Sequence, residues 1–88
     1  MCPTAVIALN RAIAISQLEG PERGLLELDS IVDRKRLAAY PFYPAALADL
    51  ELRAGRRDDA CRHFREALAL ARNPAERQFF EQRLASCM

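Results

Sequence analysis

The chain has 88 residues, of which 51% are hydrophobic and 28% are charged, and its formal net charge is +1 at pH 7. This length suits a single domain spanning residues 1–88, and the composition lacks the low hydrophobicity and high charge typical of disorder. The near-neutral balance provides no electrostatic field that would draw the chain onto nucleic acid or anionic lipid, and no apolar run approaches the ~20 residues that a bilayer requires. We therefore expect neither direct nucleic-acid contact nor membrane association.

The three cysteines, Cys2, Cys61 and Cys87, are an odd number and lack the spacing of metal ligands. The first four residues also lack the basic region of a signal peptide. Both observations favour a reducing compartment, so the sequence predicts a cytoplasmic protein. We expect Cys61 to be a small core residue, and Cys2 and Cys87 to lie near frayed ends, where adventitious oxidation is favoured over a function.

The first predicted helix runs from Pro3 to about Leu18 and closes at Gly20. It is unusually apolar, with bulky residues Val6, Ile7, Leu9, Ile13, Ile15 and Leu18. A terminal helix of a small domain should present a broad polar face to water. This helix therefore either lies between two layers or packs against something outside these 88 residues.

The second predicted helix starts at Gly20-Pro21 and runs to about Val32, with Leu25, Leu28, Ile31 and Val32 facing inward. A charged, solvated link follows at residues 33–36. Pro41 and Pro44 disfavour helix in the residue before each of them, so the third helix begins between Phe42 and Pro44. It ends at Ala54 and is capped by Gly55, with Leu47 and Leu50 on its core side.

The fourth predicted helix lies within 55–71, where the apolar residues fall on one helical stripe: Ala60, Cys61, Phe64, Ala67, Leu68 and Ala71. Next, Asn73-Pro74-Ala75-Glu76 is typical of a capping box, with Asn73 as the cap and Glu76 reaching back. A fifth helix then runs to about Ala85, with Phe80 and Leu84 inward and Phe79 as a further candidate for the interior, and covers the exposed end of the preceding helices.

A repeat is visible within the chain. Gly24, Leu28 and Ile31 recur as Ala60, Phe64 and Ala67, each 36 residues later. This period is typical of stacked helical hairpins such as the tetratricopeptide repeat (TPR). The predicted fold is therefore all-α: two TPR-like helical hairpins and a C-terminal capping helix, about five helices in total.

Several longer runs carry a family resemblance: ALNRAIA (8–14), GPERGLLELD (20–29), YPAALADLELRAGR (43–56) and REALALARNPAERQFFEQRLA (65–85). Together they resemble the C-terminal extension of bacterial extracytoplasmic-function (ECF) RNA polymerase sigma factors of the YCII/DGPF-associated group. The resemblance implies a regulatory module that modulates the sigma factor through protein contacts with its core regions or with RNA polymerase. The promoter-melting and helix-turn-helix regions of that family are missing here, so we expect a C-terminal fragment of a longer sigma factor.

Two alternatives stay open at this stage. A stand-alone TPR-like adaptor would bind a peptide or self-associate, and a homodimer contact would cover the apolar first helix equally well. An enzyme is not expected, because no acid–base pair, nucleophile dyad or metal set converges in the sequence, and no cofactor is predicted. His63, the only histidine, is explained by a surface pair with Asp59 one turn earlier.

The candidate partner-binding residues come from two groups, namely the aromatic residues Tyr40, Phe42 and Tyr43, and the polar residues Asn10, Arg11, Asp49 and Arg53. The aromatic group suits an anchor for a partner segment, or else a plug at the join between the hairpins. The polar group lies on the first helices of the two hairpins, which line the concave face of TPR arrays. Ordinary solvated surface, with Asp49 and Arg53 paired on one helix, is the alternative for this second group.

Overall fold

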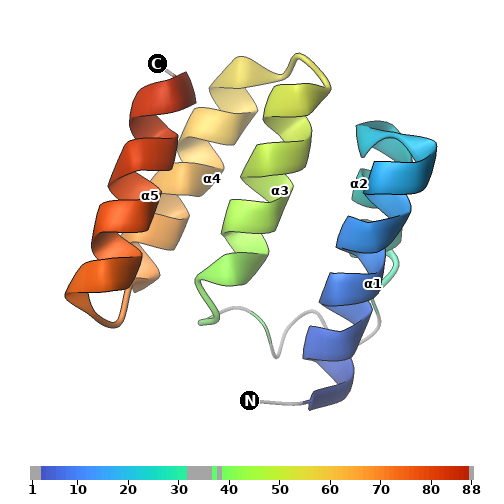
Figure 1. Cartoon of the computed structure of the whole chain (residues 1–88), viewed down its shortest axis with the longest axis horizontal. Helices are drawn as coiled ribbons and strands as arrows, with labels where there is room; N and C mark the ends of the chain where they lie inside the picture. The colour runs from blue at the N-terminus through green and yellow to red at the C-terminus, as the bar shows by residue number, and fades with distance from the viewer. Residues whose placement is uncertain (1–2, 32–36, 38, 88) are drawn as a thin grey trace.

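The all-α fold is confirmed by the computed structural model, which describes residues 3–31, 37 and 39–87 (Figure 1). The described ranges contain no strand, and their helices are α1 (Pro3–Glu19), α2 (Pro21–Asp29), α3 (Phe42–Arg53), α4 (Arg57–Leu70) and α5 (Pro74–Cys87). Each corresponds to a helix that the sequence predicts. The predicted end of the second helix at Val32 and the charged link at 33–36 lie outside the described residues.

Two glycines make the tight turns between paired helices. Gly20 and Gly55 have φ angles of 96° and 87°, in the region that residues with a Cβ rarely adopt. The helix after Gly20 is shorter than predicted, because Ser30 caps it and donates its hydroxyl proton to the carbonyl oxygen of Glu27 at 2.8 Å. Ile31, although buried, therefore follows α2 instead of belonging to it.

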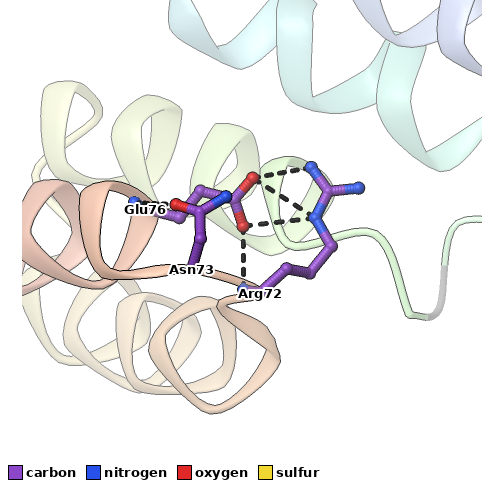
Figure 2. A network of polar contacts seen from close by, with 3 residues as sticks. All are labelled: Arg72, Asn73 and Glu76. Atoms are coloured by element: carbon purple, nitrogen blue, oxygen red, sulfur yellow. Dashed lines mark hydrogen bonds and ion pairs between the residues drawn. The ribbon is translucent and has the colours of Figure 1, made fainter.

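The start of α5 is held by the polar network in Figure 2. As the capping box predicts, the backbone N–H of Glu76 donates to Oδ1 of Asn73 at 2.9 Å. The return bond differs from the prediction, since the Glu76 carboxylate accepts from the backbone N–H of Arg72 at 2.9 Å and from its guanidinium. These hydrogen bonds, the one to the guanidinium first, lower the pKa of Glu76, and the same side-chain bond raises the pKa of Arg72.

The helices bury their apolar residues in two clusters on either side of α3, which lies between the α1–α2 and α4–α5 pairs (Figure 1). The first cluster joins α1, α2 and one face of α3 and contains Leu9, Leu28 and Leu50. The second joins the opposite face of α3 to α4 and α5 and contains Phe64 and Phe80. Leu28 and Phe64, which are related by the 36-residue spacing, are 0% and 1% exposed, so both point inward as predicted.

Helix α2 is in very close contact with its neighbours at Gly24. A Cβ placed there would lie 2.5 Å from Cβ of Ser16 in α1 and 2.9 Å from Cδ1 of Leu50 in α3. Neither distance is compatible with normal packing, so the absent side chain is what allows α1, α2 and α3 to approach.

The cysteines correct one expectation. Cys87 is not at a frayed end, because it is 0% exposed at the end of α5 and forms a disulfide with Cys61, with the two Cα atoms 5.8 Å apart. Helices α4 and α5 run antiparallel (Figure 1), which brings the start of one beside the end of the other. Cys61 is a buried residue of the second cluster, as expected, but it is bonded to a partner that the sequence did not suggest.

A groove between the first, third and fifth helices

A groove of about 540 Å³ opens between α1, α3 and α5. Its walls combine residues from distant parts of the chain: Leu9, Asn10, Ile13, Tyr40, Phe42, Ala45, Ala46, Asp49, Phe64, Phe79 and Arg83. Most of these are apolar or aromatic, and the polar groups are restricted to Asn10, Asp49, Arg83 and the Tyr40 hydroxyl. This composition is typical of a site that buries an apolar group and orients it with a few polar contacts.

Four aromatic rings line the groove, those of Tyr40, Phe42, Phe64 and Phe79, and the buried ring of Phe80 packs against two of them. The ring centroids of Tyr40 and Phe42 are 5.5 Å apart, those of Phe42 and Phe80 are 5.4 Å apart, and those of Phe79 and Phe80 are 5.5 Å apart. Phe79 is 47% exposed and is thus available to a partner, whereas Phe80 is buried. Tyr40 packs on the first cluster and Phe42 on the second, so these two rings also close the join between the clusters, the structural role that the sequence left open.

A charged pair spans the groove from α3 to α5. Arg83 donates through its guanidinium to the carboxylate of Asp49, and its Cζ atom also lies 5.5 Å from the centroid of the Phe64 ring. The two charged side chains are 34% and 43% exposed, so water reaches both. The predicted Asp49–Arg53 pair is wrong, because Asp49 is bonded to Arg83 on the neighbouring helix.

The structure divides the predicted partner-binding residues into two sets. Asn10, Tyr40, Phe42 and Asp49 line the groove, whereas Arg11, Tyr43 and Arg53 do not. Arg11 and Arg53 are exposed elsewhere on their helices, and Tyr43 lines a second hollow of about 480 Å³ between α2 and α3. Phe42 and Tyr43 line different hollows because successive residues of a helix are rotated by about 100° about its axis.

Phe79 and Arg83 on α5 also line the groove, although the sequence assigned neither of them to a partner-binding site. Their spacing of four places both on one side of a helix, and this signal was present in the sequence. This spacing alone did not predict a site, because only the packing of α5 against α4 brings Phe79 and Arg83 beside α3.

The histidine does not pair as predicted. Nδ1 of His63 lies 2.5 Å from Oε1 of Glu51 in α3, and Asp59 pairs instead with Arg62. The His63 and Glu51 side chains are only 17% and 10% exposed, so this pair links α3 to α4 from a largely buried position. In the part of the chain that the structure describes, no group of three or more metal-ligating side chains comes together.

Comparisons with known proteins give one relative. The chain is 35% identical over 82 residues to an uncharacterized protein, R00370, of Rhizobium meliloti strain 1021. The match covers 93% of this chain but only 19% of the relative, so the chain spans about a fifth of the relative's length. No family model and no solved structure matches this chain. Within residues 3–31, 37 and 39–87, none of the helices has both the length and the apolar character needed to cross a bilayer.

Proposed function

We propose that these residues form a protein-contact module: the TPR-like C-terminal regulatory domain of a bacterial ECF-type RNA polymerase sigma factor. In this role the domain modulates transcription initiation by contacting the sigma core regions or RNA polymerase. The contact role rests on one observation, the groove in which four helices bring an exposed aromatic ring, apolar side chains and an arginine together. Aromatic residues and arginine are the side chains most enriched at binding hot spots.

The chemistry of the groove indicates what it binds. Arg83 is already held by Asp49 and by the ring of Phe64, so a partner carboxylate would have to displace an existing contact. Asn10 is exposed and carries both a donor and an acceptor, which suits the main chain of a partner. The groove therefore suits a mainly apolar protein segment whose apolar side chain lies against Phe79 and whose backbone bonds to Asn10.

Two further observations support the rest of the proposal. The relative contains the matched segment as about a fifth of its length, which agrees with a module inside a longer protein. The 36-residue correspondence of buried residues in α2 and α4 agrees with a TPR-like repeat. The low formal charge of +1 favours protein over nucleic acid as the partner.

A pull-down with RNA polymerase and the matching sigma core regions tests the proposal. The variants Phe79→Ala and Asn10→Ala remove exposed groove side chains, and Leu26→Ala is the matched control, because Leu26 is 64% exposed outside this groove. We expect each groove variant to weaken capture about tenfold, as loss of a hot-spot side chain does, while Leu26→Ala binds normally. Helical circular dichroism should be unchanged in all three.

Two results would contradict the proposal. Failure of the unmodified protein to retain either polymerase or sigma regions would remove the sigma-factor assignment. Retention that is indifferent to Phe79→Ala and Asn10→Ala would remove the groove as the contact site.

A further inference from the structure

Helix α3 is covered on two opposite faces. Ala45 and Ala48 belong to the cluster shared with α4 and α5. On the other side, Leu50 belongs to the cluster shared with α1 and α2, and Tyr43 and Leu47 pack against it. The third helix is thus enclosed between its own pairing helix and the pair of helices that precedes it (Figure 1).

Helix α1 has the same pattern 36 residues earlier, but only one of its two faces is covered. Leu9 and Ala12 stand 36 residues before Ala45 and Ala48 and are 2% and 1% exposed. The counterparts of Tyr43, Leu47 and Leu50 on α1 are all exposed to solvent: Ile7, Arg11 and Ala14.

We call the residues Ile7, Arg11, Ala14 and Leu18 the α1 stripe, since their spacing of four, three and four places them on one side of the helix. Ile7 is 59% exposed and Leu18 is 86% exposed, so bulky apolar groups mark both ends of the stripe. A helix face with exposed bulky apolar groups at both of its ends is expected to have a covering element.

We infer that the α1 stripe is a stacking face for the second helix of a preceding helical pair, contributed by the same polypeptide upstream of these residues. The equivalent residues of α3, namely Tyr43, Leu47 and Leu50, are covered by the α1–α2 pair, and Leu50 directly faces Gly24 of α2. In a stack of helical repeats each pair buries its face only against the next one. This inference rests on the proposal that the chain is part of a longer protein, and four fifths of the relative do lie outside the matched segment.

The residue types expected in the covering helix follow from α2 and α4, the second helices of the two pairs within the chain. Both α2 and α4 bury a small residue and, four positions later, a bulky apolar residue, as Gly24 with Leu28 and Ala60 with Phe64. The covering helix should repeat this spacing. It should also place a carboxylate opposite Arg11, which is exposed and forms no ion pair with any residue that the structure describes.

A second copy of the chain fits the α1 stripe less well. A two-fold contact pairs each patch with itself. With Arg11 near the middle of the stripe, such a contact would bring two guanidinium groups together between the apolar ends, an arrangement that costs free energy as they lose water.

Thiol labelling of the protein expressed from its complete reading frame tests the inference. In a Cys2→Ser background, Ala14→Cys places a thiol in the stripe and Ala69→Cys places one on the exposed side of α4 as the matched control. We expect a maleimide to react with the thiol at position 14 about tenfold or more slowly than with the one at position 69, because burial limits access. Equal labelling rates at positions 14 and 69 would overturn the inference. This outcome also applies if the complete reading frame adds no helices ahead of α1.

The same experiment separates the other occupants. Slow labelling at position 14 that becomes fast on dilution would show that a second copy covers the stripe, and protection that appears only when RNA polymerase is added would show that a partner covers it. Either result overturns the inference. Both labelling results can be distinguished from failure of the proposed function, because that failure is measured separately by the polymerase pull-down.

A second pair of variants guards against a local effect of the introduced thiol. Ile7→Glu should lower the thermal unfolding midpoint of the complete protein by several degrees, because its counterpart Tyr43 packs against the first cluster and the change would bury a charge against the covering helix. Leu26→Glu, at a position whose counterpart Arg62 is exposed, should leave the midpoint within about a degree, as surface substitutions do. Equal effects of the two variants would contradict the inference.

Discussion

Replacing Gly24 by alanine tests the packing of the three N-terminal helices most directly. In an ordinary helix this change stabilises by about 1 kcal/mol, because alanine has the higher helix propensity. Here the new Cβ would lie 2.5 Å from Cβ of Ser16, 3.3 Å from its Cα and 2.9 Å from Cδ1 of Leu50. The Leu50 methyl group can rotate away, but the Ser16 atoms belong to the framework of α1, which can only move as a helix.

The magnitude follows from these two opposing effects. Overpacking a well-packed site costs about 1–3 kcal/mol, and contact with atoms that cannot rotate away puts this site toward the upper end. After subtraction of the propensity gain, we expect Gly24→Ala to lower the free energy of unfolding by about 1–2 kcal/mol. For a domain of this size, that corresponds to a fall of roughly 4–16 °C in the unfolding midpoint.

Urea denaturation followed by circular dichroism measures this difference, and a second substitution identifies its cause. Ser16→Gly removes the Cβ nearest to the new methyl group, so Gly24→Ala should be far less harmful in that background, with a coupling of about 1 kcal/mol or more. Additive effects of the two substitutions would refute the steric explanation. A Gly24→Ala protein more stable than the unmodified one would refute the close approach of α1 and α2 itself.

Three further predictions concern two polar contacts and the disulfide. The pKa of Glu76 is lowered in the folded state from an ordinary value of 4.5, so the ionised carboxylate stabilises the folded protein fully above that value and loses this effect as the pH falls through the lowered pKa. The difference in urea midpoint between the unmodified protein and Glu76→Gln should therefore be larger at pH 6 than at pH 3. An equal difference at the two pH values would contradict this prediction. Reduction of the Cys61–Cys87 bond, which closes a loop spanning 26 positions, should lower the free energy of unfolding by about 3–4 kcal/mol in the chain-entropy estimate. An unchanged midpoint with reductant, or a mass showing all three cysteines as free thiols before reduction, would refute the bond. His63→Leu should lower the free energy of unfolding by about 1–3 kcal/mol, because it leaves the buried carboxylate of Glu51 unpaired. The double variant His63→Leu with Glu51→Leu should recover much of this loss. If the double variant loses as much stability as the sum of the two single variants, the pair is refuted.

The positions of the helices could be read from the sequence because the signals for them are local. Gly20 and Gly55 end helices through a backbone conformation that other residues avoid, and Asn73 begins one by accepting a bond from Glu76 three residues on. The stripe containing Phe64 predicts which face of α4 is buried, whatever lies opposite. The fold class and the inward-facing residues follow from such short-range patterns.

The candidate site was only half predictable for the same reason. Asn10 and Asp49 were identified from their places on the first helices of the two pairs, and both line the groove. Arg83 was not, because its contact with Asp49 joins residues 34 positions apart and depends on where α5 packs. The sequence assigned Asp49 to Arg53 since a neighbour one turn away is the contact that helix geometry alone can supply.

The sequence by itself determined that this chain forms helices, where they begin and, apart from the end of α2, where they end, because helix periodicity, caps and turns depend on residues a few positions apart. Only the tertiary structure decided the contacts between helices: the Cys61–Cys87 disulfide, the pair between His63 and Glu51, and the groove between α1, α3 and α5. Each of these depends on the rotation and translation of one helix against another. Those relations are set by how all the side chains of the core pack together, and no short stretch of sequence contains them.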